Sequence, residues 1–148
     1  MRIVIGSDHA GFPLKASIVE LVKSLGHSVE DVGSHTPDPV DFPDIARAVT
    51  DRITAGEADR GLMVCGTGVG ASIAANKVKG IRAAVCHDVH SAHQSVEHDD
   101  VNVMCIGAQI VGPWLAKDLV AAYLVAEFST DEDFRRRVRK LAEMDEKR

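Results

Sequence analysis

A cysteine followed directly by a glycine-rich loop is the most reactive feature of the sequence. Apolar residues lead into Cys65, and Gly66, Gly68 and Gly70 then alternate with other residues, the first being Thr67. Glycine lets backbone amides face a ligand with no Cβ in the way. A helical pattern follows, and a helix start adds unpaired N–H donors and partial positive charge. The loop could therefore hold an anion or a transient oxyanion, with Cys65 as a nucleophile, a base or a plain loop residue.

The same glycines allow a second interpretation. Gly66, Gly68 and Ala71 satisfy the loose dinucleotide pattern G-x-G-x-x-A, and Asp88 follows after a further strand. The match lies on the third expected strand and not in an opening βαβ unit, so it is weak. A nucleotide-binding regulatory module remains the alternative to an enzyme.

A carboxylate and an imidazole follow the first expected strand. Asp8 and His9 precede Gly11. They could bind a hydroxyl or phosphate group or transfer a proton. Equally, Asp8 could cap the next helix and leave His9 exposed.

Further histidines lie in the second half of the chain. His98 ends an expected helix just before a strand, where a charged imidazole is favoured, so it could act as an acid or base. His90, His93 and Glu97 share a helical face at spacings that could hold zinc. Because the H-E-x-x-H pattern is absent, we favour a solvated face and predict no metal site.

A basic cluster lies near the C-terminus of the sequence. It consists of Arg135, Arg136, Arg137, Arg139 and Lys140. Nearby carboxylates partly neutralise it, so a solvated face is the ordinary interpretation. One arginine of the set could still clamp a phosphate group with two parallel hydrogen bonds.

Composition limits the class of protein. The 148 residues suit one domain, 1–148, with its own core. The net charge of -5 gives no support for nucleic-acid binding, and no apolar run is long enough for a membrane span. The first residues indicate a strand and not a leader. Three widely spaced cysteines indicate reduced thiols, and we expect a cytoplasmic protein.

The elements that must position these residues alternate regularly. Strands are expected over 2–6, 29–32, 61–65, 81–86 and 101–106, and helices over 13–25, 45–56, 71–78, 87–97, 113–128 and 130–147. This alternation predicts an α/β protein with a five-stranded parallel sheet between two layers of helices. Ligands of such sheets bind beyond the carboxyl ends of the strands, so the first and third loops could be neighbours. The segment 129–148 is the least able to bury its apolar face, and we expect it to pack on a second subunit.

Several segments occur together in order over residues 1 to about 125. They are Gly6–Phe12 with Lys15, Asp41–Pro43, Cys65–Gly70 with Ala74–Lys77, Gly80–Ala83, and His98 before Asn102. The Cys-Gly-Thr-Gly-x-Gly block followed by Ala-Ala-Asn-Lys is the most specific. The sequence resembles the type B ribose-5-phosphate isomerase family, which also includes the galactose-6-phosphate isomerase subunits.

The resemblance implies a Rossmann-like fold and an aldose–ketose isomerase of sugar phosphates that works through an enediolate, without metal or cofactor. It implies a homodimer or homotetramer with active sites shared between subunits. By position, Cys65 would be the base, Thr67 would shuttle protons, and the amides of Gly66, Gly68 and Gly70 would hold the enediolate.

The same resemblance gives roles to residues outside the loop. His98 and Asp8 would open the sugar ring, and Asp99 would contact substrate. His9 and Arg137 would bind the phosphate group, one of them across the dimer.

Departures from the family pattern bear on the substrate. Phe42 stands where tyrosine is usual, Gln109 where arginine is usual, Asp99 where asparagine is usual, and Asp131–Phe134 replaces Gly-Gly-Arg-His. We expect ribose 5-phosphate and ribulose 5-phosphate as the leading pair. A tetrose 4-phosphate, a hexose 6-phosphate and an inactive partner subunit are the alternatives, although retention of Cys65, Thr67 and His98 argues against the last.

Overall fold

A parallel sheet forms the centre of the computed structural model, which describes residues 1–148. Its five strands are β1 (Arg2–Ser7), β2 (Ser28–Asp31), β3 (Arg60–Cys65), β4 (Ala83–Val85) and β5 (Val103–Gly107). They pair in the order β2-β1-β3-β5-β4, all parallel. β1 and β3 are therefore neighbours, as the sequence suggested for the loops that follow them.

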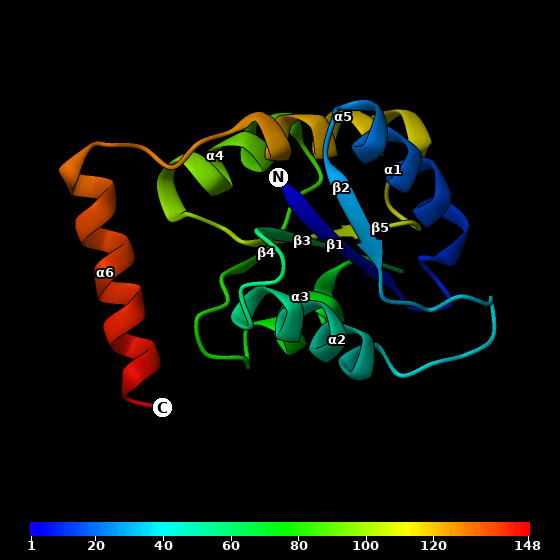
Figure 1. Ribbon diagram of the computed structural model, residues 1–148, viewed down its shortest axis with the longest axis horizontal. Coiled ribbons are helices and arrows are strands. Elements are labelled where there is room, and N and C mark those ends of the chain that lie inside the picture. The colour runs from blue at the N-terminus through cyan, green and yellow to red at the C-terminus, as the bar shows by residue number, and fades with distance from the viewer.

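Helices cover both faces of the sheet (Figure 1). They are α1 (Phe12–Ser24), α2 (Phe42–Thr54), α3 (Val69–Ala75), α4 (Val89–Asp99), α5 (Pro113–Val125) and α6 (Glu132–Glu146). Ile3 and Ile5 of β1 pack with α1, α4 and α5, whereas Val4 packs with α2 and α3. This alternation follows from the two-residue period of a strand and gives two separate cores. The predicted fold class is confirmed.

Several elements are shorter than the sequence suggests, among them β4, α5 and α6. β4 covers only three residues: the Asn76 carboxamide bonds both backbone groups of its first residue, Ala83, and Asn102 Oδ1 accepts from the Arg82 N–H just before it. α5 ends at Val125, where the backbone of Ala126 becomes extended. The Arg60 guanidinium donates hydrogen bonds to the carbonyl oxygen of Tyr123 at 2.6 Å and to that of Ala126 at 2.7 Å.

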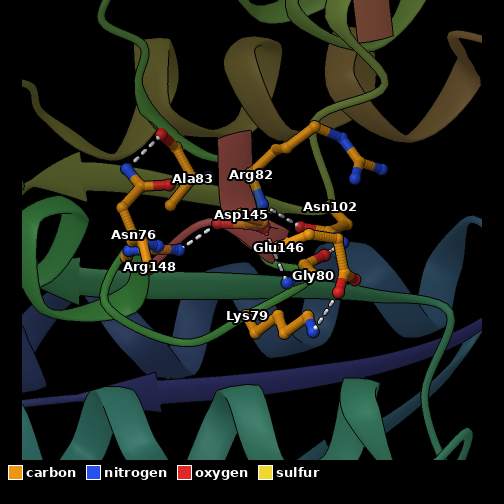
Figure 2. Close-up of polar contacts among 9 residues, drawn as sticks. All are labelled: Asn76, Lys79, Gly80, Arg82, Ala83, Asn102, Asp145, Glu146 and Arg148. Carbon is orange, nitrogen blue, oxygen red and sulfur yellow. Dashed lines mark hydrogen bonds and ion pairs between the residues drawn. The ribbon is translucent and has the colours of Figure 1, made fainter. Parts of the chain in front are cut away.

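α6 stands apart from the two cores, and none of its residues is buried (Figure 1). Its C-terminal turn is tied to the segment before β4, where the Asp145 carboxylate accepts from the Gly80 N–H and Lys79 pairs with Glu146 (Figure 2). The Gly80 N–H holds the pKa of the Asp145 carboxyl below its usual range. A cavity of about 610 Å³ separates the helix from the sheet edge. Its packing on a second subunit stays a prediction. No helix in the fold has the length and apolar character that crossing a membrane requires.

Candidate active site

The loops after β1 and β3 meet at the carboxyl edge of the sheet. Ser7 lies opposite Val64 in the register of the two strands, so Asp8 and His9 leave the sheet beside Cys65. The loops approach so closely that a Cβ on Gly11 would lie 1.9 Å from the Val64 carbonyl oxygen. The chain runs from β1 to one side of the sheet and from β3 to the other, which makes this crevice the switch point where such sheets bind ligands.

The Cys65 thiol lies beneath the glycine loop. Cys65 is 5% exposed, and its Sγ accepts a hydrogen bond of 2.9 Å from the Gly68 N–H. Gly68 has a φ of +82°, a left-handed conformation that glycine adopts without strain, and it caps α3. The turn thus directs a backbone amide at the sulfur.

Three amides of the same loop have no acceptor in the protein. The N–H groups of Gly66, Thr67 and Gly70 donate to no backbone or side-chain atom, whereas the Thr67 hydroxyl accepts from Val69 at 3.3 Å. Thr67 is exposed. Free donors on a fixed loop can stabilise negative charge that forms on a bound molecule.

Asp8 and His9 each hold a piece of backbone at this edge. Asp8 is 8% exposed, and its Oδ1 accepts from the Gly11 N–H at 2.9 Å, although no side chain caps α1 itself, so the capping alternative is wrong. Its Oδ2 has no partner. The His9 Nδ1 accepts from the Val40 N–H at 3.2 Å, so a neutral ring carries its proton on Nε2. One carboxylate oxygen and one N–H donor are left beside the thiol.

Two of the departures from the family pattern touch the glycine loop. A Cβ on Gly70 would lie 2.9 Å from the Phe42 ring, and one on Gly66 would lie 3.1 Å from the Gln109 Oε1. A neutral carboxamide and a phenyl ring therefore cover the loop at these positions. Both residues line the candidate site.

His87 is a residue at this edge to which the sequence gave no role. Its Nε2 accepts a 2.9 Å hydrogen bond from the N–H of Gly107, the residue opposite Cys65 on β5. Gly107 packs against the loop, since a Cβ there would lie 2.6 Å from the Gly66 carbonyl oxygen. The position of His87 just past a strand end was the available signal.

Lowering the pH should weaken this support. Burial lowers the pKa of His87, and protonation removes the acceptor that Gly107 uses. The unfolded chain therefore binds the proton more readily, so this contribution to stability is complete above about pH 6.5 and falls as the pH drops towards the folded value. Urea denaturation should show that the free energy of unfolding falls from pH 8 to pH 5 by more in the wild type than in His87→Gln. Identical pH dependence in the two proteins would contradict this role.

His98, Asp99 and Arg137 are not brought to the thiol of their own chain. α4 begins near the carboxyl edge and returns the chain to the start of β5, so His98 and Asp99 lie at the amino edge. With 11 residues, α4 spans about 16 Å. Arg137 lies near His98, because its guanidinium contacts the Phe134 ring that stacks on His98.

The structure contains neither the geometry of a zinc site on α4 nor that of a dinucleotide site at Asp88. His93 contacts Glu97 at 3.2 Å, but no three histidine, cysteine or acidic side chains form a group that could hold a metal ion. In the dinucleotide interpretation Asp88 should bind a ribose, yet its two oxygens accept from the backbone N–H and hydroxyl of Ser91 at 2.7 Å each. Asp88 is the N-terminal cap of α4.

The geometry suits an enzyme that takes a proton from carbon and stabilises the oxyanion left behind. Aldose–ketose isomerases belong to this class. Comparison with known proteins agrees, since the family model described as Ribose/Galactose Isomerase matches residues 3–141. The chain belongs to this family.

Individual relatives cover most of the chain. It is 45% identical over 127 residues to ribose-5-phosphate isomerase B of Escherichia coli, covering 86% of this chain and 85% of that protein. It is also 45% identical over 131 residues to D-erythrulose-4-phosphate isomerase 2 of Mycolicibacterium smegmatis, with 86% of each covered. The solved structure of Clostridium thermocellum ribose-5-phosphate isomerase B superposes with a TM-score of 0.96 at 46% identity, covering 99% of both chains.

These findings confirm the predicted family and Rossmann-like fold, and with them the prediction of a sugar-phosphate isomerase of the aldose–ketose class. They do not separate the substrates, because relatives named for a pentose and for a tetrose phosphate share the same identity with the chain.

Proposed function

We propose that the protein interconverts ribose 5-phosphate and ribulose 5-phosphate through an enediolate, with Cys65 as the base. The observation that carries this proposal is the buried sulfur, held 2.9 Å from the Gly68 N–H, beside a loop with three unpaired amides. The names of the E. coli and C. thermocellum relatives support this pentose pair.

Each step has a group to perform it. The Cys65 thiolate removes the proton from C2 of the open-chain aldose, and the electron pair forms a C1=C2 double bond while O1 becomes an oxyanion. The free N–H groups of Gly66, Thr67 and Gly70 stabilise that charge. Transfer of a proton from O2 to O1, assisted by the Thr67 hydroxyl, and return of the first proton from sulfur to C1 give the ketose. The step is balanced and needs no oxidant or metal.

A tetrose 4-phosphate is the second candidate. Gln109 places a neutral carboxamide against Gly66, where the family resemblance implies an arginine. Asp133 stands where another cation is usual, and it is already paired with Arg136 at 2.7 Å. Fewer cations favour a substrate with a shorter sugar or a differently placed phosphate group. The equally similar D-erythrulose-4-phosphate isomerase of M. smegmatis supports the same candidate.

We propose further that each active site is shared between two copies of the chain in a homodimer, alone or paired into a tetramer. Cys65 ends β3 at one edge of the sheet, and β3 spans about 17 Å from the opposite edge, where His98 lies. His98, Asp99 and Arg137 therefore act in the site of the partner if they act on the substrate. In that site they would open the sugar ring and hold the phosphate group.

A turnover panel tests the function. The protein is assayed with four-, five- and six-carbon ketose and aldose phosphates, and titrated with NAD and ATP. We expect the highest kcat/KM with the pentose pair. A higher value with the tetrose pair would replace the substrate and keep the reaction. Nucleotide binding without turnover of any sugar phosphate would overturn the proposal.

A further inference from the structure

One aromatic ring of α6 contacts both groups that the chain would lend to its partner. The Phe134 ring stacks on the His98 imidazole with 3.9 Å between ring centroids and 15° between ring planes. The Arg137 guanidinium carbon lies 5.5 Å from the centroid of the same ring. His98 comes from the end of α4 and Arg137 from the next turn of α6, so Phe134 is the point at which the two meet.

The backbone around this ring is held in place. The Ser129 N–H donates to the Glu97 carbonyl at 3.0 Å, which joins the segment before α6 to the last turn of α4. The Arg135 Nε donates to the Ser129 carbonyl at 2.9 Å, and its guanidinium carbon lies 4.7 Å from the Phe128 ring centroid. The first turn of α6 and the end of α4 thus form one platform, and Phe134 is fixed next to His98.

Ordinary core packing does not account for the position of Phe134. The residue is half-buried and belongs to neither of the two hydrophobic cores. Its partners are a histidine and an arginine with long or rotatable side chains. Arg137 is exposed, so it would otherwise lose substantial rotamer freedom on binding a phosphate group.

We propose that Phe134 is a positioning residue, which sets the orientation of His98 for ring opening and of Arg137 for the phosphate group in the partner's active site. The inference rests on the proposed function. A flat ring restricts the imidazole to parallel orientations and attracts the guanidinium to its face. Groups that are already oriented lose less freedom when the substrate binds.

The test compares three variants on two substrates. Phe134→Leu keeps an apolar side chain without the flat ring, and Phe134→Tyr keeps the ring. Leu141→Ala removes an apolar side chain of the same helix, one turn beyond Arg137, where it lines the cavity beside the sheet edge. The substrates are ribose 5-phosphate, which must open its ring, and erythrose 4-phosphate, which cannot close the usual ring because its terminal oxygen carries the phosphate group.

We expect Phe134→Leu to lower kcat/KM for ribose 5-phosphate by about three- to tenfold, the size of an aromatic pair contribution. kcat should fall through His98 and KM should rise through Arg137. Erythrose 4-phosphate should show only the rise in KM. Phe134→Tyr should stay within about twofold of the wild type, and Leu141→Ala should leave the ratio between the two substrates unchanged.

The outcomes separate this inference from the proposed function. Equal losses on both substrates in Phe134→Leu, matched by Leu141→Ala, would reduce Phe134 to a structural role and overturn the inference while the isomerase stands. No turnover by the wild-type protein would overturn the function and the inference with it. The His98 C–H proton resonances give a readout that needs no turnover, because loss of the stacked ring should shift them downfield in Phe134→Leu and not in Phe134→Tyr.

Discussion

Replacing Cys65 with alanine should lower kcat by about a thousandfold and leave KM for the substrate nearly unchanged, because a positioned base contributes about 10²- to 10⁴-fold to a rate. The Gly68 N–H donates its hydrogen bond to the Cys65 sulfur. Binding should persist, since the unpaired amides and His9 remain. Steady-state kinetics with ribose 5-phosphate and binding of an unreactive sugar phosphate give the two numbers.

A matched control is available in Cys86. This cysteine is 2% exposed, follows β4 and packs in the core of α4 and α5, away from the loop. Burial raises the pKa of its thiol, which keeps it uncharged. Cys86→Ala should therefore keep near-normal kcat. If Cys65→Ala retains more than about a tenth of the wild-type kcat, another group is the base.

Two inactive variants should restore each other's activity when they form mixed dimers. The Cys65→Ala subunit still has the His98 that it contributes to its partner's site, and the His98→Asn subunit still has its own thiol. If the sites are shared, a mixed dimer therefore contains one complete site. Random pairing makes half of the dimers mixed, which returns roughly a quarter of the wild-type sites. The assay is turnover of ribose 5-phosphate after the two proteins are unfolded and refolded together.

The control pairs two changes at the same edge of the sheet. Asp8 and Cys65 leave neighbouring strands of one chain. A mixed dimer of Cys65→Ala with Asp8→Asn therefore has no complete site and should stay inactive. Recovery in this control, or no recovery in the first mixture although mixed dimers are present, would exclude sharing of His98 between subunits.

The meeting of Asp8, His9 and Cys65 could be predicted from the sequence, because loops after parallel strands gather at one edge and β1 and β3 are adjacent. The separation of His98 from Cys65 could also be deduced from topology, since a helix between parallel strands must return the chain from the carboxyl edge of the sheet to its amino edge. The residues alone nevertheless left its role open, and only the family resemblance implied a shared site.

Other features depend on contacts that no local pattern encodes. β5 lies inside the sheet and β4 at its edge, although β4 comes first in the chain. Ile81 made the β4 pattern look longer, whereas side chains from Asn76 and Asn102 occupy the backbone there. The positions of Phe42 on Gly70 and Gln109 on Gly66 likewise arise from packing between distant segments.

The carboxamide of Asn76 has a consequence for how the molecule behaves at high concentration. By bonding both the N–H and the carbonyl of Ala83, at 2.9 Å each, it fills the outward backbone positions that a strand from another molecule would use (Figure 2). Exposed outer strands recruit further strands and lead to aggregation. Asn76 belongs to the Ala-Ala-Asn-Lys block. Part of the family sequence pattern therefore hinders the edge strand β4 from pairing with a strand of another molecule.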